Sequence, residues 1–136
     1  MRVIAKQTKK ILIVDDDAYC REAVRLALEE QGYLNVEVTE SANVASGIQQ
    51  MKDITPDIVI LDLHMPGKNG FDFMDIVHKN KWSPNTKVIM LSADGSMENV
   101  LKAEKKGIGA YNFLSKPFNI SDLQALVLSL SVLVKT

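Results

Sequence analysis

The stretch Ile-Leu-Ile-Val-Asp-Asp-Asp, residues 11–17, joins four consecutive branched apolar residues to three consecutive carboxylates. An apolar run of this length is typical of a strand that is buried on both faces of a parallel sheet. Three more short apolar runs follow at residues 58–61, 88–91 and 111–114, and the first two of these are also expected to be fully buried. The alternating stretch 36–39 indicates a half-exposed edge strand. The sequence therefore predicts five strands.

Segments with helical spacing lie between these strands. Asp17 is placed to cap a helix that runs to about Gln31, where Gly32 would supply a left-handed stop. Ser41 is placed to cap the next helix. Further helices are predicted over residues 70–80, 97–106 and 121–134. The alternation of strands and helices predicts an α/β fold, a doubly wound parallel sheet with right-handed crossovers and helices on both faces.

The composition is that of one ordinary soluble domain, with 136 residues, 46% apolar residues and a formal net charge of −1. A balanced charge argues against direct nucleic-acid binding and against a polybasic membrane surface. Cys20 is the single cysteine, and no apolar run approaches the roughly 20 residues of a membrane span, so a cytoplasmic location is expected. Residues 1–9 are expected to form a basic arm, and residues 10–136 the folded domain.

Polar residues follow the predicted strands directly. They are the triplet 15–17 after the first strand, Asp62 after the third, Ser92 after the fourth and Lys116 after the fifth. Ligands of open parallel sheets bind outside the carboxyl ends of the strands. We therefore expect these side chains to converge at one edge of the sheet.

Each of these residues also has an ordinary structural explanation. Asp17 is a good helix cap, a serine after a strand often serves a turn, and an isolated lysine is usually solvated. The combination is harder to explain, because two carboxylates about 5 Å apart repel by roughly 3 kcal/mol at an effective dielectric of about 20. A cation among them relieves that cost, and hard oxygen ligands at an open site suit Mg²⁺. Ser92 and Lys116 would then supply the donors that a phosphoryl group needs.

Phosphate-binding motifs of other kinds are absent from the sequence. There is no Gly-x-Gly-x-x-Gly after the first strand and no Gly-Lys-Ser/Thr, so a dinucleotide site and a P-loop are both unsupported. The candidate phosphate acceptor is a carboxylate, which forms an acyl phosphate in known covalent catalysis.

Four motifs carry a resemblance: Ile-Leu-Ile-Val-Asp-Asp-Asp (11–17), Val-Ile-Leu-Asp-Leu-His-Met-Pro-Gly-Lys-Asn-Gly (59–70), Met-Leu-Ser-Ala (90–93) and Lys-Pro-Phe (116–118). In this order, from about Lys10 to Val134, the chain resembles the receiver domains of two-component response regulators. The resemblance implies a flavodoxin-like fold with strand order 2-1-3-4-5. It also implies a signalling switch rather than an enzyme, with only Mg²⁺-dependent self-phosphorylation and slow autodephosphorylation.

The resemblance also assigns roles to individual residues. Asp62 is implied to be the phosphoacceptor, and Ser92 and Lys116 are implied to contact the phosphoryl oxygens. The implied Mg²⁺ ligands are the side chains of Asp15, Asp16 and Asp62 and the backbone carbonyl of His64. The Lys116–Pro117 bond is implied to be cis.

Three further positions have two explanations each. Phe113 matches the family's switch aromatic and equally fits an ordinary buried strand residue. His64 and Asp94 lie two residues after Asp62 and Ser92, at positions that tune hydrolysis of the acyl phosphate in relatives. His64 also fits a solvated loop histidine.

The partners implied are a histidine kinase or a histidine phosphotransfer protein as donor. The output domain or target protein is expected on the face formed by helix 97–106, strand 111–114 and helix 121–134, with a phosphorylation-dependent homodimer as a further option. On the last helix, Leu128 and Val132 lie opposite the apolar stripe and are expected to be exposed and to serve such an interface.

A second class of function remains open on the residues alone. Asp15-x-Asp17 after the first strand fits the nucleophile and general acid of haloacid dehalogenase-like phosphohydrolases, which also form an aspartyl phosphate. That interpretation leaves Asp62 and the motif 116–118 unexplained. A third possibility is a receiver that is never phosphorylated and acts only through contacts, which the full set of site residues disfavours.

Overall fold

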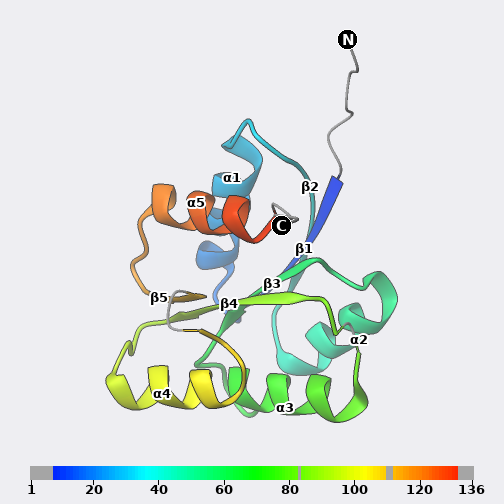
Figure 1. Cartoon of the computed structure of the whole chain (residues 1–136), viewed down its shortest axis with the longest axis vertical. Helices are drawn as coiled ribbons and strands as arrows, with labels where there is room; N and C mark the ends of the chain where they lie inside the picture. The colour runs from blue at the N-terminus through cyan, green and yellow to red at the C-terminus, as the bar shows by residue number, and fades with distance from the viewer. Residues whose placement is uncertain (1–7, 83, 110–111, 132–136) are drawn as a thin grey trace, which may run out of the picture.

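The computed structural model describes residues 8–82, 84–109 and 112–131, which form one five-stranded parallel sheet flanked by helices (Figure 1). The strand order is β2-β1-β3-β4-β5, as expected. The strands are β1 (Thr8–Val14), β2 (Asn35–Ser41), β3 (Ile58–Asp62), β4 (Lys87–Ser92) and β5 (Phe113–Ser115). The helices are α1 (Ala18–Glu30), α2 (Val44–Ile54), α3 (Gly70–Asn80), α4 (Met97–Lys105) and α5 (Ile120–Ser131).

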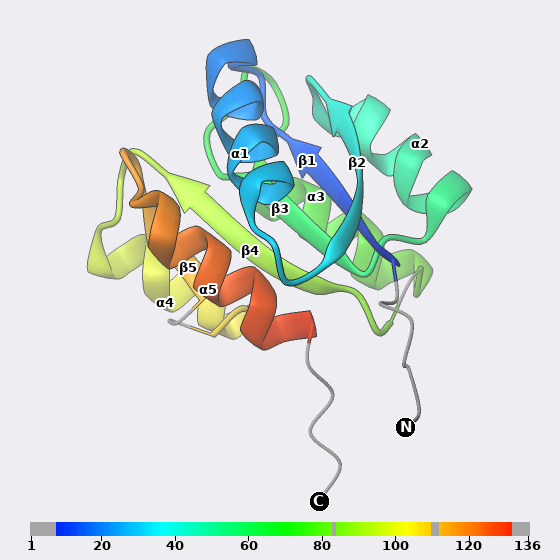
Figure 2. The same ribbon diagram turned by 90° about the horizontal axis from the view of Figure 1, so that it is seen from above.

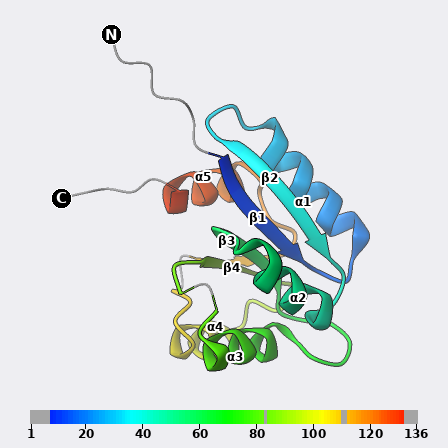
Figure 3. The same ribbon diagram turned by 90° about the vertical axis from the view of Figure 1, so that its right-hand side faces the viewer.

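Helices cover both faces of the sheet. Figures 1 and 3 show α1 and α5 on one face and α2, α3 and α4 on the other. Alternate residues of β1 and β3 enter the two cores, so Ile13 and Ile60 pack with α1 and α5, while Val14 and Leu61 pack with α2 and α3. Because β3 is buried along its whole length, its last residue is carried on the most rigid part of the domain.

The helices α1 and α5 lie side by side over the sheet (Figure 2). The side-chain amide of Gln124 donates a hydrogen bond of 2.8 Å to the carbonyl oxygen of Ala27, which joins the two helices. Leu128 lies one turn further along this flank of α5 and is half-buried rather than exposed, which corrects the expectation from the helical projection. Val132 and the predicted end of the helix at Val134 lie outside the described residues, as does Tyr111 at the predicted start of β5.

At two helix ends, the residue that caps the helix differs from the predicted one. Gln31 ends α1 with an extended backbone, and Gly32 is not among the residues with positive φ. The Gln31 side chain closes the helix instead, because its amide donates to the carbonyl oxygen of Leu28 and its oxygen accepts from the backbone N–H of Leu34. Asn43 caps α2 in place of Ser41.

Pairing within the sheet explains the second difference. Ser41 pairs with Val14 as the last residue of β2, and its carbonyl oxygen accepts from the backbone N–H of Asp15 at 3.0 Å. A residue in this ladder is no longer available as a helix cap. Pairing also extends β1 at its start, since Thr8 and Lys9, which we assigned to the basic arm, are residues of the strand.

Candidate functional site

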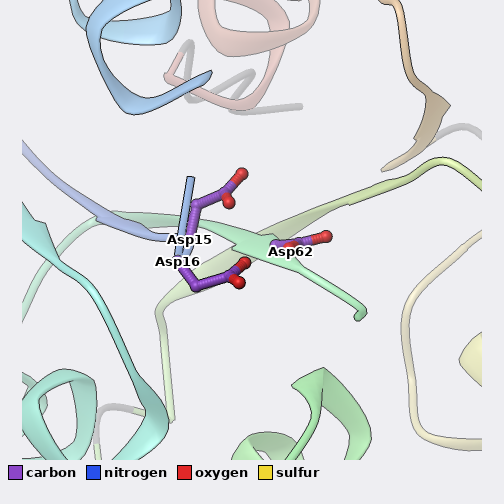
Figure 4. Close-up of side chains that lie close together, drawn as sticks. All are labelled: Asp15, Asp16 and Asp62. Atoms are coloured by element: carbon purple, nitrogen blue, oxygen red, sulfur yellow. The ribbon is translucent and has the colours of Figure 1, made fainter. Parts of the chain in front are cut away.

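Three carboxylates meet at the carboxyl edge of the sheet, as the positions of the strand ends predict. Asp15 and Asp16 follow β1, and Asp62 ends the neighbouring strand β3 (Figure 4). One oxygen of each residue lies within 4.8 Å of the others. Asp15 and Asp62 are buried whereas Asp16 is exposed, so this acidic cluster has a closed floor and a side open to solvent.

Lys116, which directly follows the edge strand β5, adds a positive charge to the acidic cluster. Its Nζ lies 2.9 Å from Oδ2 of Asp15 and 3.4 Å from Oδ1 of Asp62. The backbone N–H of Lys116 donates to the carbonyl oxygen of Ser92 at 2.8 Å, which continues the pairing of β4 with β5 past the strand end. The Lys116–Pro117 peptide bond is cis, as the sequence resemblance implied.

The two buried carboxylates titrate differently. Burial and, after it, the charge of Asp15 raise the pKa of Asp62 to about 6, since Lys116 and the backbone N–H of His64 oppose them only in part. Burial also disfavours the charged form of Asp15, but hydrogen bonds from Lys116, Cys20 and the Asp17 amide outweigh it and lower the pKa of Asp15. Lys116 is therefore mainly the counter-charge of Asp15. The negative charge of Asp62 is only partly compensated.

The donor set fits a small divalent cation. Three carboxylates face one ammonium group, so the ionised cluster has a formal charge of −2 before a cation is added. All the candidate ligands are hard oxygens, and the open side at Asp16 leaves room for the water ligands that Mg²⁺ retains. The guanidinium of Arg21 donates to the backbone carbonyl oxygen of Asp15 at 2.6 Å and pairs with Glu40 rather than with a carboxylate of the cluster.

Asp62 is also oriented by its own loop. The backbone N–H of His64 donates to Oδ1 of Asp62 at 3.3 Å, the same oxygen that Lys116 approaches. The His64 side chain is exposed. The carboxylate is thus held through Oδ1 by an amide and an ammonium group.

Ser92 lies at the end of β4 but is engaged in its own turn. Its Oγ donates to the carbonyl oxygen of Asp94 and accepts from the backbone N–H of Asp94, both at 3.0 Å. The Asp94 carboxylate accepts from the backbone N–H of Ser96 at the start of α4. The structure therefore commits the Ser92 hydroxyl to the loop that follows β4.

Asp17 has a structural role. Its carboxylate caps α1 by accepting from the backbone N–H groups of Tyr19 and Cys20. Its own N–H donates to Oδ1 of Asp15. Asp17 therefore serves as the helix cap that its position predicts.

Phe113 is half-buried and packs against the core on the side of α3 and α4. It lies in β5, paired with Met90 of β4. The position is compatible with both explanations given above, so its role as a switch stays a prediction.

Two residues that shape the site were not found from the sequence. A Cβ atom on Gly70 would lie 2.7 Å from the carbonyl oxygen of Asp62, so the first turn of α3 packs directly on the end of β3. The Cys20 thiol hydrogen-bonds to Asp15, and burial followed by this contact raises the pKa of Cys20 to about 12. The sequence does contain a signal for Gly70, because a glycine at the start of a helix, directly after the cap Asn69, is typical of a close approach.

Within the described ranges, no helix has the length and apolar character needed to cross a membrane.

Comparison with known proteins gives consistent matches. The family model for the response regulator receiver domain matches residues 11–128. The chemotaxis protein CheY of Thermotoga maritima is 38% identical over 114 residues, which cover 83% of this chain and 89% of that protein. The phosphate regulon transcriptional regulatory protein PhoB of Pseudomonas aeruginosa is 34% identical over 117 residues, or 86% of this chain and 49% of that protein. The chain thus spans about half the length of such regulators.

A solved structure, the receiver domain of the Francisella response regulator 1452, matches with a TM-score of 0.78 and 30% identity, covering 90% of this chain and 95% of that one. The match agrees with the sequence motifs that end β1, β3 and β4. The chain therefore belongs to the response regulator receiver domain family of two-component signalling systems.

Proposed function

We propose that this receiver domain is a phosphorylation-dependent switch in which Asp62 accepts a phosphoryl group from a phosphohistidine donor. One observation carries the proposal: Asp62 ends the central strand within reach of both the half-buried ammonium group of Lys116 and two further carboxylates. A nucleophile, a positive group for the phosphoryl oxygens and a cation site then lie together. The donor is a histidine kinase or a histidine phosphotransfer protein.

In the transfer step, Oδ2 of Asp62 attacks the phosphorus atom because Oδ1 is already held by Lys116 and His64. The new O–P bond replaces the P–N bond of the donor, and the imidazole nitrogen that leaves takes up a proton. Mg²⁺ supplies charge neutralisation to the transferring group. The residues proposed to hold it are Asp15, Asp16 and Asp62, with the carbonyl of His64. Lys116 binds a phosphoryl oxygen when the phosphate displaces its contact with Asp62.

The added charge of about −2 is proposed to pull the Ser92 hydroxyl out of its turn with Asp94 and onto a phosphoryl oxygen. This motion also displaces the start of α4, because its cap, Ser96, lies two residues after Asp94. Ala103 is the only buried residue in the described part of α4, so little core contact opposes a shift of the helix. Phe113 is proposed to follow the loop as the switch aromatic.

The output is proposed to be read on the face formed by α4, β5 and α5, either by an output domain or target protein or by a second copy of the domain. His64 and Asp94 are proposed to tune how fast water hydrolyses the acyl phosphate, since both flank the loops around Asp62. The only chemistry proposed for the domain itself is self-phosphorylation with Mg²⁺ and slow autodephosphorylation. The proposed location is the cytoplasm, with no direct contact of this domain to nucleic acid.

The test is incubation with acetyl phosphate or phosphoramidate and Mg²⁺, followed by intact mass and peptide mapping. One phosphoryl group is expected on the peptide that contains Asp62. Asp62→Asn is expected to remain unlabelled, whereas Asp53→Asn, which alters an exposed carboxylate on α2, is labelled like the wild type. A label on Asp15 would refute the assignment and favour the phosphohydrolase interpretation.

A further inference from the structure

A cavity of about 390 Å³ lies at the amino edge of the sheet, away from the acidic cluster. It is lined by residues of α3, by residues 81, 82, 84 and 86 between α3 and β4, and by one residue each of α2, β3 and β4. Figure 1 shows α2 and α3 on the same side of the sheet, which is the side where the cavity lies. Its volume is in the range of pockets that bind small molecules.

The walls of the cavity are apolar. They are formed mainly by Met51, Val59, Phe73, Met74, Val77 and Val88. All but Val88 are buried, with at most 7% of their surface exposed, so they belong to the core. Methionine side chains adapt to the shape of a bound group, and two of them face this space. A flat apolar molecule fits such walls better than a polar one.

Trp82 forms one side of the cavity mouth and is fixed there by the end of α3. Lys81 has a left-handed backbone with φ 55°, which turns the chain, and the backbone N–H of Trp82 donates to the carbonyl oxygen of Val77 at 3.3 Å. The Nζ of Lys52 lies 4.7 Å from the centre of the Trp82 ring. A cation above one face of the indole helps to hold the ring in place.

The charged side chains at the mouth are all basic. His78 and Lys81 line it, and no aspartate or glutamate is present among the described lining residues. The remaining hydroxyl of the lining is already used, because Thr86 donates to the carbonyl oxygen of Pro56. The ionisable groups of the described lining are therefore one ammonium group, that of Lys81, and one imidazole, that of His78.

We propose that this cavity is a second binding site, for a small planar aromatic anion whose ring system enters the apolar space and whose acidic group faces Lys81. Such a ligand buries its apolar surface against the core residues and keeps its charge at the partly hydrated rim. The site is separate from the acidic cluster and does not depend on phosphorylation of Asp62. Nothing in the match to the receiver family assigns it.

The test uses anilinonaphthalene sulfonate as the aromatic anion and N-phenylnaphthylamine as the matched ligand without the sulfonate. Trp82 is the single tryptophan of the chain, so its emission reports on the cavity mouth. Saturable binding of one molecule of the sulfonate is expected, with quenching of Trp82 emission by energy transfer. The uncharged analogue is expected to bind about two- to five-fold more weakly at low salt.

Three variants separate the cavity from the rest of the surface. Val77→Phe fills the cavity and is expected to weaken both ligands by about ten-fold or more. Lys81→Gln is expected to weaken only the sulfonate, by about two- to five-fold. Lys79→Gln removes an exposed charge at the same end of α3 that does not line the cavity, and it is expected to bind like the wild type.

Amide chemical shifts of the wild-type domain show where the sulfonate binds even if Val77→Phe fails to fold. Sulfonate-induced shifts are expected at Phe73, Val77 and Val88. Shifts confined to the exposed apolar residues Met97 and Leu101 of α4 would overturn the proposal. Equal affinity of the two ligands, or equal effects of the Lys79 and Lys81 variants, would overturn the assignment of an anionic ligand.

Discussion

Nζ of Lys116 lies 2.9 Å from Oδ2 of Asp15, although the two residues are 101 positions apart in the sequence. This ion pair ties the ends of β1 and β5 together across β3 and β4, which lie between them. The same ammonium group lies 3.4 Å from Asp62, so one positive charge is shared by two buried carboxylates. The excess of negative charge and the close packing around it lead to the following predictions.

Removing the ammonium group should destabilise the metal-free domain. Lys116→Ala leaves Asp15 buried without its counter-charge, and we expect a loss of about 2 to 3 kcal/mol of unfolding free energy at neutral pH. Urea denaturation in a chelating buffer measures the loss. Lys102→Ala is the control, because its pair with Glu98 is exposed and is expected to change stability by less than about 0.5 kcal/mol. Similar losses in both variants would show that the buried pair adds nothing.

Mg²⁺ should raise the melting temperature of the wild type, because the ion binds the native cluster and relieves its repulsion. Asp16→Asn removes the carboxylate on the open side and is expected to abolish most of this increase. Asp17→Asn is the matched control, since asparagine caps a helix as well as aspartate does and the cluster stays intact. Equal Mg²⁺-dependent shifts in the wild type and Asp16→Asn would argue against a metal site.

The raised pKa of Asp62 predicts a specific pH dependence. Below about pH 4 the group is protonated in both states, and between about pH 4 and pH 6 the folded protein keeps a proton that the unfolded chain has lost. The contribution of Asp62 to stability therefore falls as pH rises through this range, by about 2 to 3 kcal/mol in total.

Asp62→Asn removes this titration, so its stability relative to the wild type is expected to rise from about pH 4 to pH 6 and then level off. Chemical denaturation without Mg²⁺ at a series of pH values gives the difference. Asp15, whose pKa is lowered, stabilises the fold above the pKa of the unfolded chain and remains in both proteins. A difference that does not change with pH would contradict the raised pKa.

Gly70→Ala is expected to be strongly destabilising. The new Cβ would lie 2.7 Å from the carbonyl oxygen of Asp62 and 3.1 Å from Cα of Leu63, both of which are backbone atoms that cannot rotate away. We expect a loss of about 2 kcal/mol or more and a weaker Mg²⁺ response, because the end of β3 must shift. Gly32→Ala, where a Cβ meets nothing within 4 Å, is the control, and thermal unfolding with and without Mg²⁺ compares the two.

The β4–α4 loop should be controlled by a contact with β5. A Cβ on Gly95 would collide with Oγ of Ser115, so Gly95→Ala is expected to displace the loop that carries the Ser92–Asp94 turn. Ser115→Ala removes that oxygen, and the double variant is expected to recover most of the lost stability. A double-mutant cycle by urea denaturation measures this coupling, and additive effects would refute it.

The sequence predicted the sheet and the convergence of Asp15, Asp62 and Lys116 because both follow from simple rules. Buried apolar runs form parallel strands, and the strand ends meet at one edge. The strand order and the roles of the site residues came from the family resemblance. Both ends of α3, Gly70 and Asn80, were also predicted.

The errors have local causes that no periodicity reveals. A glutamine that folds back on its own helix, as Gln31 does, replaces a glycine stop without any change in composition. Ser41 was a plausible cap until pairing with β1 drew it into the strand. The turn that holds Ser92 and the close approach of Gly70 depend on distances between backbones, which sequence patterns do not contain.

The distance in sequence between Asp15 and Lys116 also determines when the two residues can pair during translation. A ribosome adds roughly 5 to 20 residues per second, so roughly 5 to 20 s pass between the synthesis of the two partners. Once Asp62 has been added, and until Lys116 follows, the nascent chain carries every carboxylate of the cluster but not the ammonium group that partly balances them. The ion pair between Asp15 and Lys116 therefore forms only after the last strand, β5, has been synthesised.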